Sequence, residues 1–145
     1  MHVVLEVLSA ARTLERNAQI VFRAYGLTAA QFNVLNCLAD QPNGMRASDL
    51  AQGLLVDPSN VTGMLKRMKK EGWLHEIENP KDLRQRVVAL SSKGRTAWTA
   101  AHSAYQRSLD LLSSGLTARQ CSTCVATLQV LSAAATRLGA LSPDA

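Results

Sequence analysis

A helix start at Asp57-Pro58 constrains the fold of this chain more than any other feature of its sequence. A carboxylate just before a helix can accept hydrogen bonds from backbone N–H groups that have no partner inside the helix. A proline at the first helical position costs no internal hydrogen bond, because an N–H at that position has no partner in the helix. The sequence therefore predicts a helix from Pro58 to about Glu71, and Gly72 ends it.

This expected helix has two different faces. Three apolar residues at spacings of four and three mark the face that packs: Val61, Leu65 and Met68. The rest of the surface is polar or basic and consists of Ser59, Asn60, Thr62, Gly63, Lys66, Arg67 and Lys70. The pattern predicts a helix that buries one side and offers the other to a polar partner.

The neighbouring segments place this helix in a larger motif. A short helix of about two turns is expected over Ser48–Leu54, just before it. Two short strands are expected after it, Trp73–Glu78 and Arg84–Leu90, joined by a turn over Asn79–Leu83. This order is that of a winged helix-turn-helix, so the predicted fold class is mainly α with a small β-hairpin wing.

The dimensions of such a motif suit duplex DNA. An α-helix is about 10 to 12 Å across with its side chains, and the major groove is about 12 Å wide. A guanidinium group at the tip of the hairpin can enter the narrow minor groove, where the negative potential is strongest. The segment from Asp57 to Arg95 contains nine Lys and Arg residues and five acidic residues, so most of the net charge of +5 falls in this segment.

Two further helices are expected before the motif. Thr28 with Gln31 three residues later is a capping-box pattern, which predicts a helix that ends within Asp40–Gly44. A long first helix is expected to end near Tyr25-Gly26. Its apolar face consists of Val4, Leu5, Leu8, Ala11, Leu14, Ala18, Val21 and Phe22.

Two helices are also expected after the motif. Ser91 is a candidate cap for a helix that runs to Leu112, and Thr117 is a candidate cap for a last helix after Gly115. The last helix has an apolar stripe that consists of Cys121, Cys124, Leu128, Leu131, Ala135 and Leu138. The stripes of the first and last helices exceed what a small winged domain can cover, so they are expected to pair in a homodimer.

The bulk properties narrow the class of protein. At 145 residues a single domain is expected, with a winged core over 27–91 and dimerisation helices over 1–25 and 92–140. No stretch approaches the roughly 20 apolar residues that span a membrane, and the N-terminus lacks the pattern of a secretory signal. A cytoplasmic protein without a membrane partner is therefore expected.

Several segments resemble the MarR family of bacterial transcriptional regulators. These segments are Leu27–Phe32, Ser48–Ala51, Asp57–Met68, the wing Asn79–Arg84 and its exit Val88–Gly94. The resemblance implies a homodimeric repressor that binds a palindromic operator and releases it in response to a small aromatic or phenolic molecule or an oxidant. The alternative function is that of a winged-helix protein-interaction module that does not bind DNA specifically.

The resemblance also assigns roles to single residues. Pro58–Glu71 is the recognition helix, Arg84 is the minor-groove residue of the wing, and Asp82 is its anionic partner. The expected DNA contacts are Ser59, Asn60, Thr62, Gly63, Lys66, Arg67, Arg84 and Arg86. The chain departs from the family pattern at three positions. Arg46 stands where Thr or Ser is more frequent, Gly63 where Arg is more frequent, and Ser91 where Thr is more frequent.

Each of these roles has a plainer alternative. Ser59, Asn60 and Thr62 are also good helix-start residues, and Lys66 and Arg67 suit a solvated helix face. Asp82 can pair with Arg84, or it can favour the turn by bonding its own backbone. Trp98 and Tyr105 are expected to pack between helices rather than to form a ligand cage.

The sequence offers no site for an enzyme, a metal or a cofactor. It contains no glycine-rich phosphate loop and no nucleophile recognisably paired with a base. The three histidines, at positions 2, 75 and 102, show no metal-ligand spacing. Cys37, Cys121 and Cys124 lie among apolar residues and are expected to be reduced thiols packed in a core.

Overall fold

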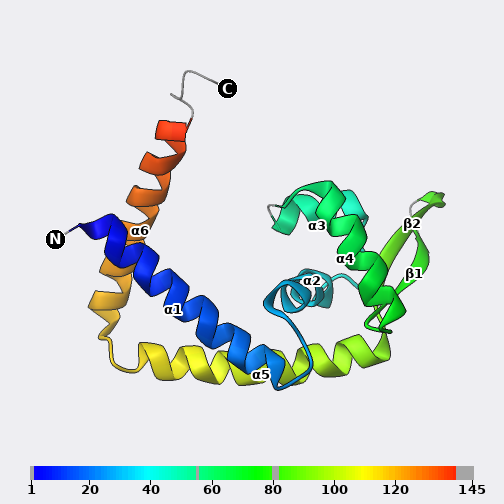
Figure 1. Cartoon of the computed structure of the whole chain (residues 1–145), viewed down its shortest axis with the longest axis horizontal. Helices are drawn as coiled ribbons and strands as arrows, with labels where there is room; N and C mark the ends of the chain where they lie inside the picture. Colours follow the sequence, from blue (N-terminus) through cyan, green and yellow to red (C-terminus); the bar gives the residue numbers. More distant parts are fainter. Residues whose placement is uncertain (1, 55, 80–81, 140–145) are drawn as a thin grey trace. The chain divides into compact units, whose positions relative to one another are not determined.

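The computed structural model describes residues 2–54, 56–79 and 82–139, apart from the side chains of residues 83, 84 and 139. The chain is mainly helical with one β-hairpin, which confirms the predicted fold class (Figure 1). The elements are α1 (Val3–Arg23), α2 (Ala29–Ala39), α3 (Ala47–Leu54), α4 (Pro58–Lys70), β1 (Leu74–Asn79), β2 (Asp82–Leu90), α5 (Ser92–Ser113) and α6 (Ala118–Gly139). They form two compact units, residues 1–106 and residues 107–145.

The core of the first unit lies between α2, α3 and α4. Leu35 and Leu38 of α2 and Leu50 of α3 are completely buried. Val61 and Met68 of α4 are completely buried as well. The three helices therefore share one apolar centre, and α4 is held against it by the face that its spacing predicted.

An aromatic cluster extends this core to α1 and to the first half of α5. The rings of Phe22 and Phe32 stack with their centroids 4.0 Å apart, and the Tyr105 ring lies 5.0 Å from Phe22. Trp98 donates a hydrogen bond from Nε1 to Oδ1 of Asn36 at 3.1 Å. Tyr105 and Trp98 thus pack between helices, as predicted.

The predicted helix caps are present. The Thr28 hydroxyl accepts from the Gln31 backbone N–H, and the Gln31 side chain accepts from the Thr28 N–H, which completes the capping box before α2. Ser91 Oγ accepts from the Gly94 N–H at 2.9 Å before α5. Thr117 Oγ1 accepts from the Gln120 N–H at 3.3 Å before α6. These bonds satisfy backbone donors that the helix itself leaves unpaired.

The hairpin is attached to the helical core through a third short segment. β1 and β2 pair antiparallel, and Met45 forms an isolated bridge with Val88 of β2. Met45 and Val88 exchange two backbone hydrogen bonds, of 2.9 and 2.8 Å. Gly44 makes this approach possible, because a Cβ atom there would lie 2.7 Å from the Val88 carbonyl oxygen, and its φ of +69° favours glycine.

The turn of the hairpin is shorter than the sequence predicted. Asn79 pairs with Asp82 across the two strands, after an irregularity in the register between Glu78 and Asn79. The expected five-residue turn over 79–83 was therefore wrong, because both of its ends join the strands. Residues 80 and 81 lie outside the described residues.

The apolar stripes of α1 and α6 are largely exposed. On α1 only Ala18 and Phe22 are buried, whereas Leu5 is 63% exposed. On α6 Leu128 is 43% and Leu138 is 69% exposed. Among the described residues no helix has both the length and the apolar character that a membrane crossing requires.

The cysteines differ from the prediction. Cys37 and Cys121 are half-buried, and Cys124 is exposed. Burial raises the pKa of the Cys37 thiol, which packs against the edge of the core. The expectation that all three are core residues was wrong for Cys124, which is exposed on α6 in the single chain.

Candidate nucleic-acid interface

Helix α4 separates its buried residues cleanly from its polar ones. Val61, Leu65 and Met68 are its buried residues. All the residues that were expected to contact DNA from this helix are exposed: Ser59, Asn60, Thr62, Gly63, Lys66 and Arg67. The structure therefore brings these six residues together on one solvent-facing surface, as predicted.

The hydroxyl groups on this surface also take part in the helix start. The Asp57 carboxylate accepts hydrogen bonds from the Ser59 backbone N–H at 2.8 Å and from the Ser59 hydroxyl. These bonds lower the pKa of Asp57 and keep it ionised. The Thr62 hydroxyl donates to the Pro58 carbonyl at 3.1 Å. Both hydroxyl protons are thus used locally, and both oxygens keep lone pairs that can accept a hydrogen bond.

Three of the basic residues between Asp57 and Arg95 have structural partners. Lys69 forms an ion pair with Glu76 of β1 and lowers the pKa of that carboxyl. The Lys93 ammonium donates to the Glu71 carbonyl at 2.6 Å. Arg95 Nη1 donates to the Ala39 carbonyl at 2.7 Å. These three residues hold elements of the fold together, and the basic residues left on the surface of α4 include Lys66, Arg67 and Lys70.

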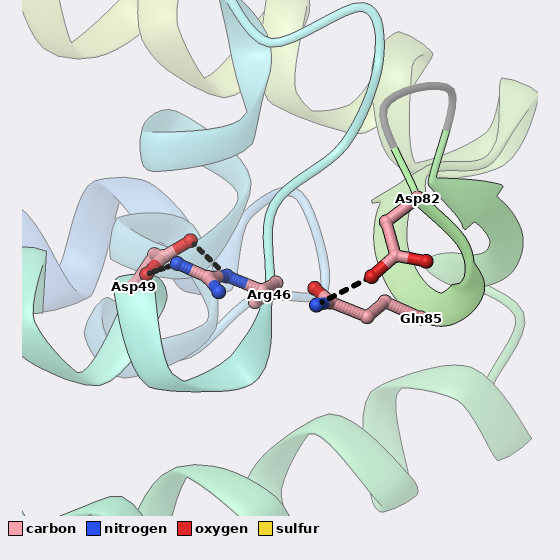
Figure 2. A network of polar contacts seen from close by, with 4 residues as sticks. All are labelled: Arg46, Asp49, Asp82 and Gln85. Atoms are coloured by element: carbon pink, nitrogen blue, oxygen red, sulfur yellow. Dashed lines mark hydrogen bonds and ion pairs between the residues drawn. The ribbon is translucent and has the colours of Figure 1, made fainter.

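The wing presents one described basic side chain toward solvent. Arg86 is exposed and pairs with Glu78 in the strand register. The Asp82 carboxylate accepts from Gln85 Nε2 at 3.0 Å, a contact that the sequence did not reveal (Figure 2). The Arg84 side chain lies outside the described residues, so its expected groove contact and its pairing with Asp82 stay predictions.

The start of α3 is closed by an ion pair in place of the usual hydroxyl cap. Arg46 accepts the Leu50 N–H through its carbonyl at 3.0 Å, which makes it the residue before the helix. Its guanidinium donates to Asp49 from Nε at 2.9 Å and from Nη2 at 3.1 Å (Figure 2). The pKa of Asp49 is lowered by these bonds. At this departure from the expected Thr or Ser, the start of α3 therefore carries an ion pair between two side chains.

The described residues do not form a metal centre. Within residues 2–54, 56–79 and 82–139, no three His, Cys, Asp or Glu side chains come together to hold an ion. His102 stacks on Trp98 with the ring centroids 4.9 Å apart. The exposed side chains of α4 carry hydroxyl, amide and basic groups.

Comparison with known proteins gives consistent relatives. A family model described as the MarR family matches residues 27–85. The multiple antibiotic resistance protein MarR of Escherichia coli is 34% identical over 106 residues, which cover 72% of this chain and 70% of that protein. The transcriptional activatory protein BadR of Rhodopseudomonas palustris is 34% identical over 90 residues, which cover 61% of this chain. The matched stretch spans about half of BadR, 51% of its length.

Solved structures share the fold. The complex of Staphylococcus aureus MepR with DNA matches with a TM-score of 0.81 at 17% identity, over 92% of this chain and 96% of that one. Wild-type MarR of Escherichia coli matches with a TM-score of 0.70 at 26% identity, over 90% and 97% of the two chains. With identity to MarR across most of both sequences and the same winged architecture, this chain belongs to the MarR family.

Proposed function

We propose that this protein is a homodimeric, sequence-specific DNA-binding regulator of transcription in the cytoplasm. The observation that carries the proposal is the division of α4 into a buried apolar face and an exposed face of hydroxyl, amide and basic groups. The proposal places α4 in the major groove and the wing in the adjacent minor groove.

The local hydrogen bonds of Ser59 and Thr62 narrow the bases that they read. Because each hydroxyl already donates its proton inside the helix start, it meets DNA as an acceptor. The major-groove donors are the amino groups of cytosine and adenine, so these two residues are proposed to face C or A. Asn60 suits the paired donor and acceptor of adenine. Gly63 has no side chain, which allows the helix backbone to approach the groove closely.

The phosphate contacts are assigned to Lys66 and Arg67 on α4 and to Arg86 on the wing. All three are exposed. Arg84 is proposed to enter the minor groove, and Asp82 to orient the wing beside it. The carboxylate of Asp82, already bonded to Gln85, favours the ordered start of β2.

The exposed stripes of α1 and α6 support a homodimer. Apolar side chains such as Leu5, Leu8 and Leu128 are 63%, 48% and 43% exposed in the single chain. Stripes of this kind on helices bury themselves against another helix. Two copies then present two recognition helices to half-sites about 34 Å apart, which calls for a palindromic operator.

A pocket in the first unit offers room for an effector. It has a volume of about 220 Å³ and lies between α1, α2 and the first half of α5, lined by Leu14, Glu15, Ala18, Phe22, Ala29, Asn33 and Tyr105. Its aromatic and aliphatic lining suits a small aromatic or phenolic molecule. The structure of CouR, a similar fold at 18% identity, holds p-coumaroyl-CoA, which is itself phenolic. Repression relieved by such a molecule is the proposed mode of regulation.

The test is the salt dependence of DNA binding. If the dimer contacts phosphates through Lys66, Arg67 and Arg86 of each subunit, log affinity falls with log salt at a slope of about −4 to −6. Lys66→Ala lowers affinity for all sequences about equally and flattens this slope, because phosphate contacts carry no sequence information. Arg84→Ala weakens binding to the preferred operator by about 1 to 3 kcal/mol per subunit.

Arg23→Ala is the matched control, because it removes the same charge from the exposed end of α1. It leaves both the slope and the affinity unchanged. A slope near zero for the parent protein would contradict the proposal and favour a protein-interaction module. An Arg84→Ala protein that binds its operator like the parent would remove the wing from the mechanism.

A further inference from the structure

The C-terminal end of α4 is tied to two other helices by one acidic residue. Glu71 caps α4, and its side-chain oxygen Oε2 accepts hydrogen bonds from Gln31 Nε2 and from Trp73 Nε1, both at 3.0 Å. Its backbone carbonyl accepts from Lys93 Nζ at 2.6 Å. The Lys93 ammonium also lies 4.0 Å from the centroid of the Trp73 ring. We call these four residues, Gln31, Glu71, Trp73 and Lys93, the α4 clamp.

The partners of Glu71 are themselves held in place. Gln31 belongs to the capping box of α2, where its Oε1 accepts from the Thr28 N–H at 2.9 Å. The Trp73 backbone N–H donates to the Met68 carbonyl at 2.9 Å, and the Trp73 carbonyl accepts from the Ser91 hydroxyl at 3.0 Å. The clamp therefore joins the end of α4 to the fixed starts of α2 and α5.

Apart from the clamp and the Lys69–Glu76 ion pair to β1, α4 is attached along one apolar face. Val61, Leu65 and Met68 hold the helix to the core along one line. A helix of 13 residues is about 20 Å long, so a tilt of about 3° displaces its first turn by about 1 Å. Specific contacts require placement within about 0.5 Å, which an apolar stripe alone does not impose. A polar tie at the far end of the helix limits this tilt.

We infer that the Glu71 side chain is a positioning residue that holds recognition helix α4 at the angle its base contacts require, by joining α4 to Gln31 and Trp73. The inference rests on the proposed DNA-binding function. Glu71 is exposed, and exposed polar contacts contribute little to global stability. Its effect is therefore expected in sequence discrimination, because phosphate contacts through long flexible side chains tolerate a small tilt and base contacts do not.

The geometry supplies an unusually clean rescue variant. Both donors meet the same oxygen of Glu71, so a glutamine amide has one carbonyl oxygen that can accept both bonds. Glu71→Gln removes the charge and keeps the tie, whereas Glu71→Ala removes both. A comparison of the two variants separates positioning from a change in the electrostatic field of the protein.

The experiment uses the full chain and a probe chosen by the parent protein. A random duplex library is selected with the parent, and the consensus duplex and a scrambled duplex of equal composition are then titrated. Glu71→Ala binds the consensus duplex on the order of tenfold more weakly and the scrambled duplex within about twofold of the parent. Glu71→Gln binds both duplexes within about twofold of the parent.

A charge exchange gives a second rescue. Gln31→Glu alone places two carboxylates against each other and weakens consensus binding as Glu71→Ala does. Adding Glu71→Gln restores binding in part, because the new amide donates to the carboxylate at position 31, but its nitrogen then replaces the oxygen that accepts from Trp73 Nε1. This pair requires no change in the number of charges relative to the parent.

Tryptophan fluorescence reports the tie directly. The chain has two tryptophans, so a Trp98→Phe background leaves Trp73 as the single reporter. In that background Glu71→Ala shifts the emission of Trp73, and Glu71→Gln does not. A spectral shift without loss of discrimination overturns the positioning role.

The outcomes for the inference and for the proposed function are distinct. If the library yields no consensus, the proposed function fails before Glu71 is tested. If a consensus emerges and Glu71→Ala binds it like the parent, the inference is overturned. Equal losses in Glu71→Ala and Glu71→Gln, or equal losses on both duplexes, also overturn it, because they indicate a charge effect or a damaged fold.

Discussion

The leucines of α2 and those of α6 occupy opposite environments, although both helices have an apolar stripe. Leu35 and Leu38 are completely buried, whereas Leu128 is 43% and Leu138 is 69% exposed. Helix α2 packs within the first unit against α1, α3 and strand β2 of the wing. The contrast teaches that periodicity identifies the apolar face of a helix and leaves open what covers it. The same chain thus has a core that it completes alone and a surface that, we propose, a second copy completes.

The largest expected effect is a cavity in the self-contained core. Leu35→Ala removes completely buried methyl groups and is expected to lower the free energy of unfolding by about 2 to 5 kcal/mol. Leu128→Ala in α6 should cost less, and its cost should depend on protein concentration if a second copy covers this residue. Chemical denaturation at two protein concentrations checks both. The comparison would be reversed if the stability loss caused by Leu35→Ala depended on protein concentration and the loss caused by Leu128→Ala were large and independent of it.

A charge on the exposed stripe should separate the proposed dimer without unfolding the first unit. Leu128→Asp places an ionised carboxylate in the interface and is expected to weaken dimerisation by about 2 kcal/mol or more. Light scattering should change from about twice the chain mass of 15.6 kDa toward the mass of one chain. Ala126→Asp is the control, because it adds the same charge on the opposite side of α6. A parent protein that is a stable monomer at micromolar concentration would contradict the dimer.

The cysteines offer a chemical version of the same comparison. In a Cys121→Ala background, Cys124 is exposed on α6, whereas Cys37 is half-buried and its thiol pKa is raised by burial. Because the thiolate is the reactive form, a maleimide should modify Cys124 of the dissociated chain at least about tenfold faster than Cys37 near neutral pH. Dilution below the dimer dissociation constant should accelerate only Cys124. Mass spectrometry of the labelled peptides measures both rates, and faster labelling of Cys37 would break the comparison.

The smallest expected effect is an acid-sensitive helix start. The folded pKa of Asp57 is lowered by its bonds to Ser59, so its contribution to stability is present above the unfolded value of about 3.9 and is lost as the pH falls through the folded value. The cap of α6 is formed by Thr117 and Gln120, which do not titrate. Hydrogen exchange at pH 6 and pH 3 should therefore show loss of protection at the start of α4 relative to α6. Asp57→Asn keeps an acceptor and should lose this difference, and an unchanged difference would assign it to another acid.

Much of the fold could be predicted because its helix boundaries depend on local chemistry. Asp57-Pro58 and the Thr28–Gln31 pair each satisfy backbone donors within a few residues, so their signals are complete in the sequence. The wing turn was predicted too long, because Asn79 and Asp82 pair across the strands, and strand register depends on a partner elsewhere in the chain.

The exposed face of α4 could also be predicted from local sequence, because the spacing of apolar residues within the helix determines it. The contacts of α4 with other parts of the chain could not be predicted in this way. The spacing of Val61, Leu65 and Met68 is enough to assign the predicted contact residues of the helix to the exposed side, whereas Met64 and Lys69 are partly buried. The role of Glu71 depends on Gln31, which is 40 residues away in the chain, and on a shared oxygen atom. No pattern of residue types encodes such a coincidence. The Arg46–Asp49 pair could have been found, since opposite charges three residues apart at a helix start are neighbours.

The bridge between Met45 and Val88 also affects the order of events during synthesis. The ribosome produces residues 1–70, which include α1, α2, α3 and α4, before any residue of the wing. The partner of Met45, Val88, is synthesised much later. Closing the long loop between these two residues is entropically slow compared with local helix formation. A nascent chain arrested after α4 would therefore hold compact helices with an unpaired backbone edge at Met45. An unpaired backbone edge is a place where another chain can pair, and the pairing of β2 with Met45 removes it.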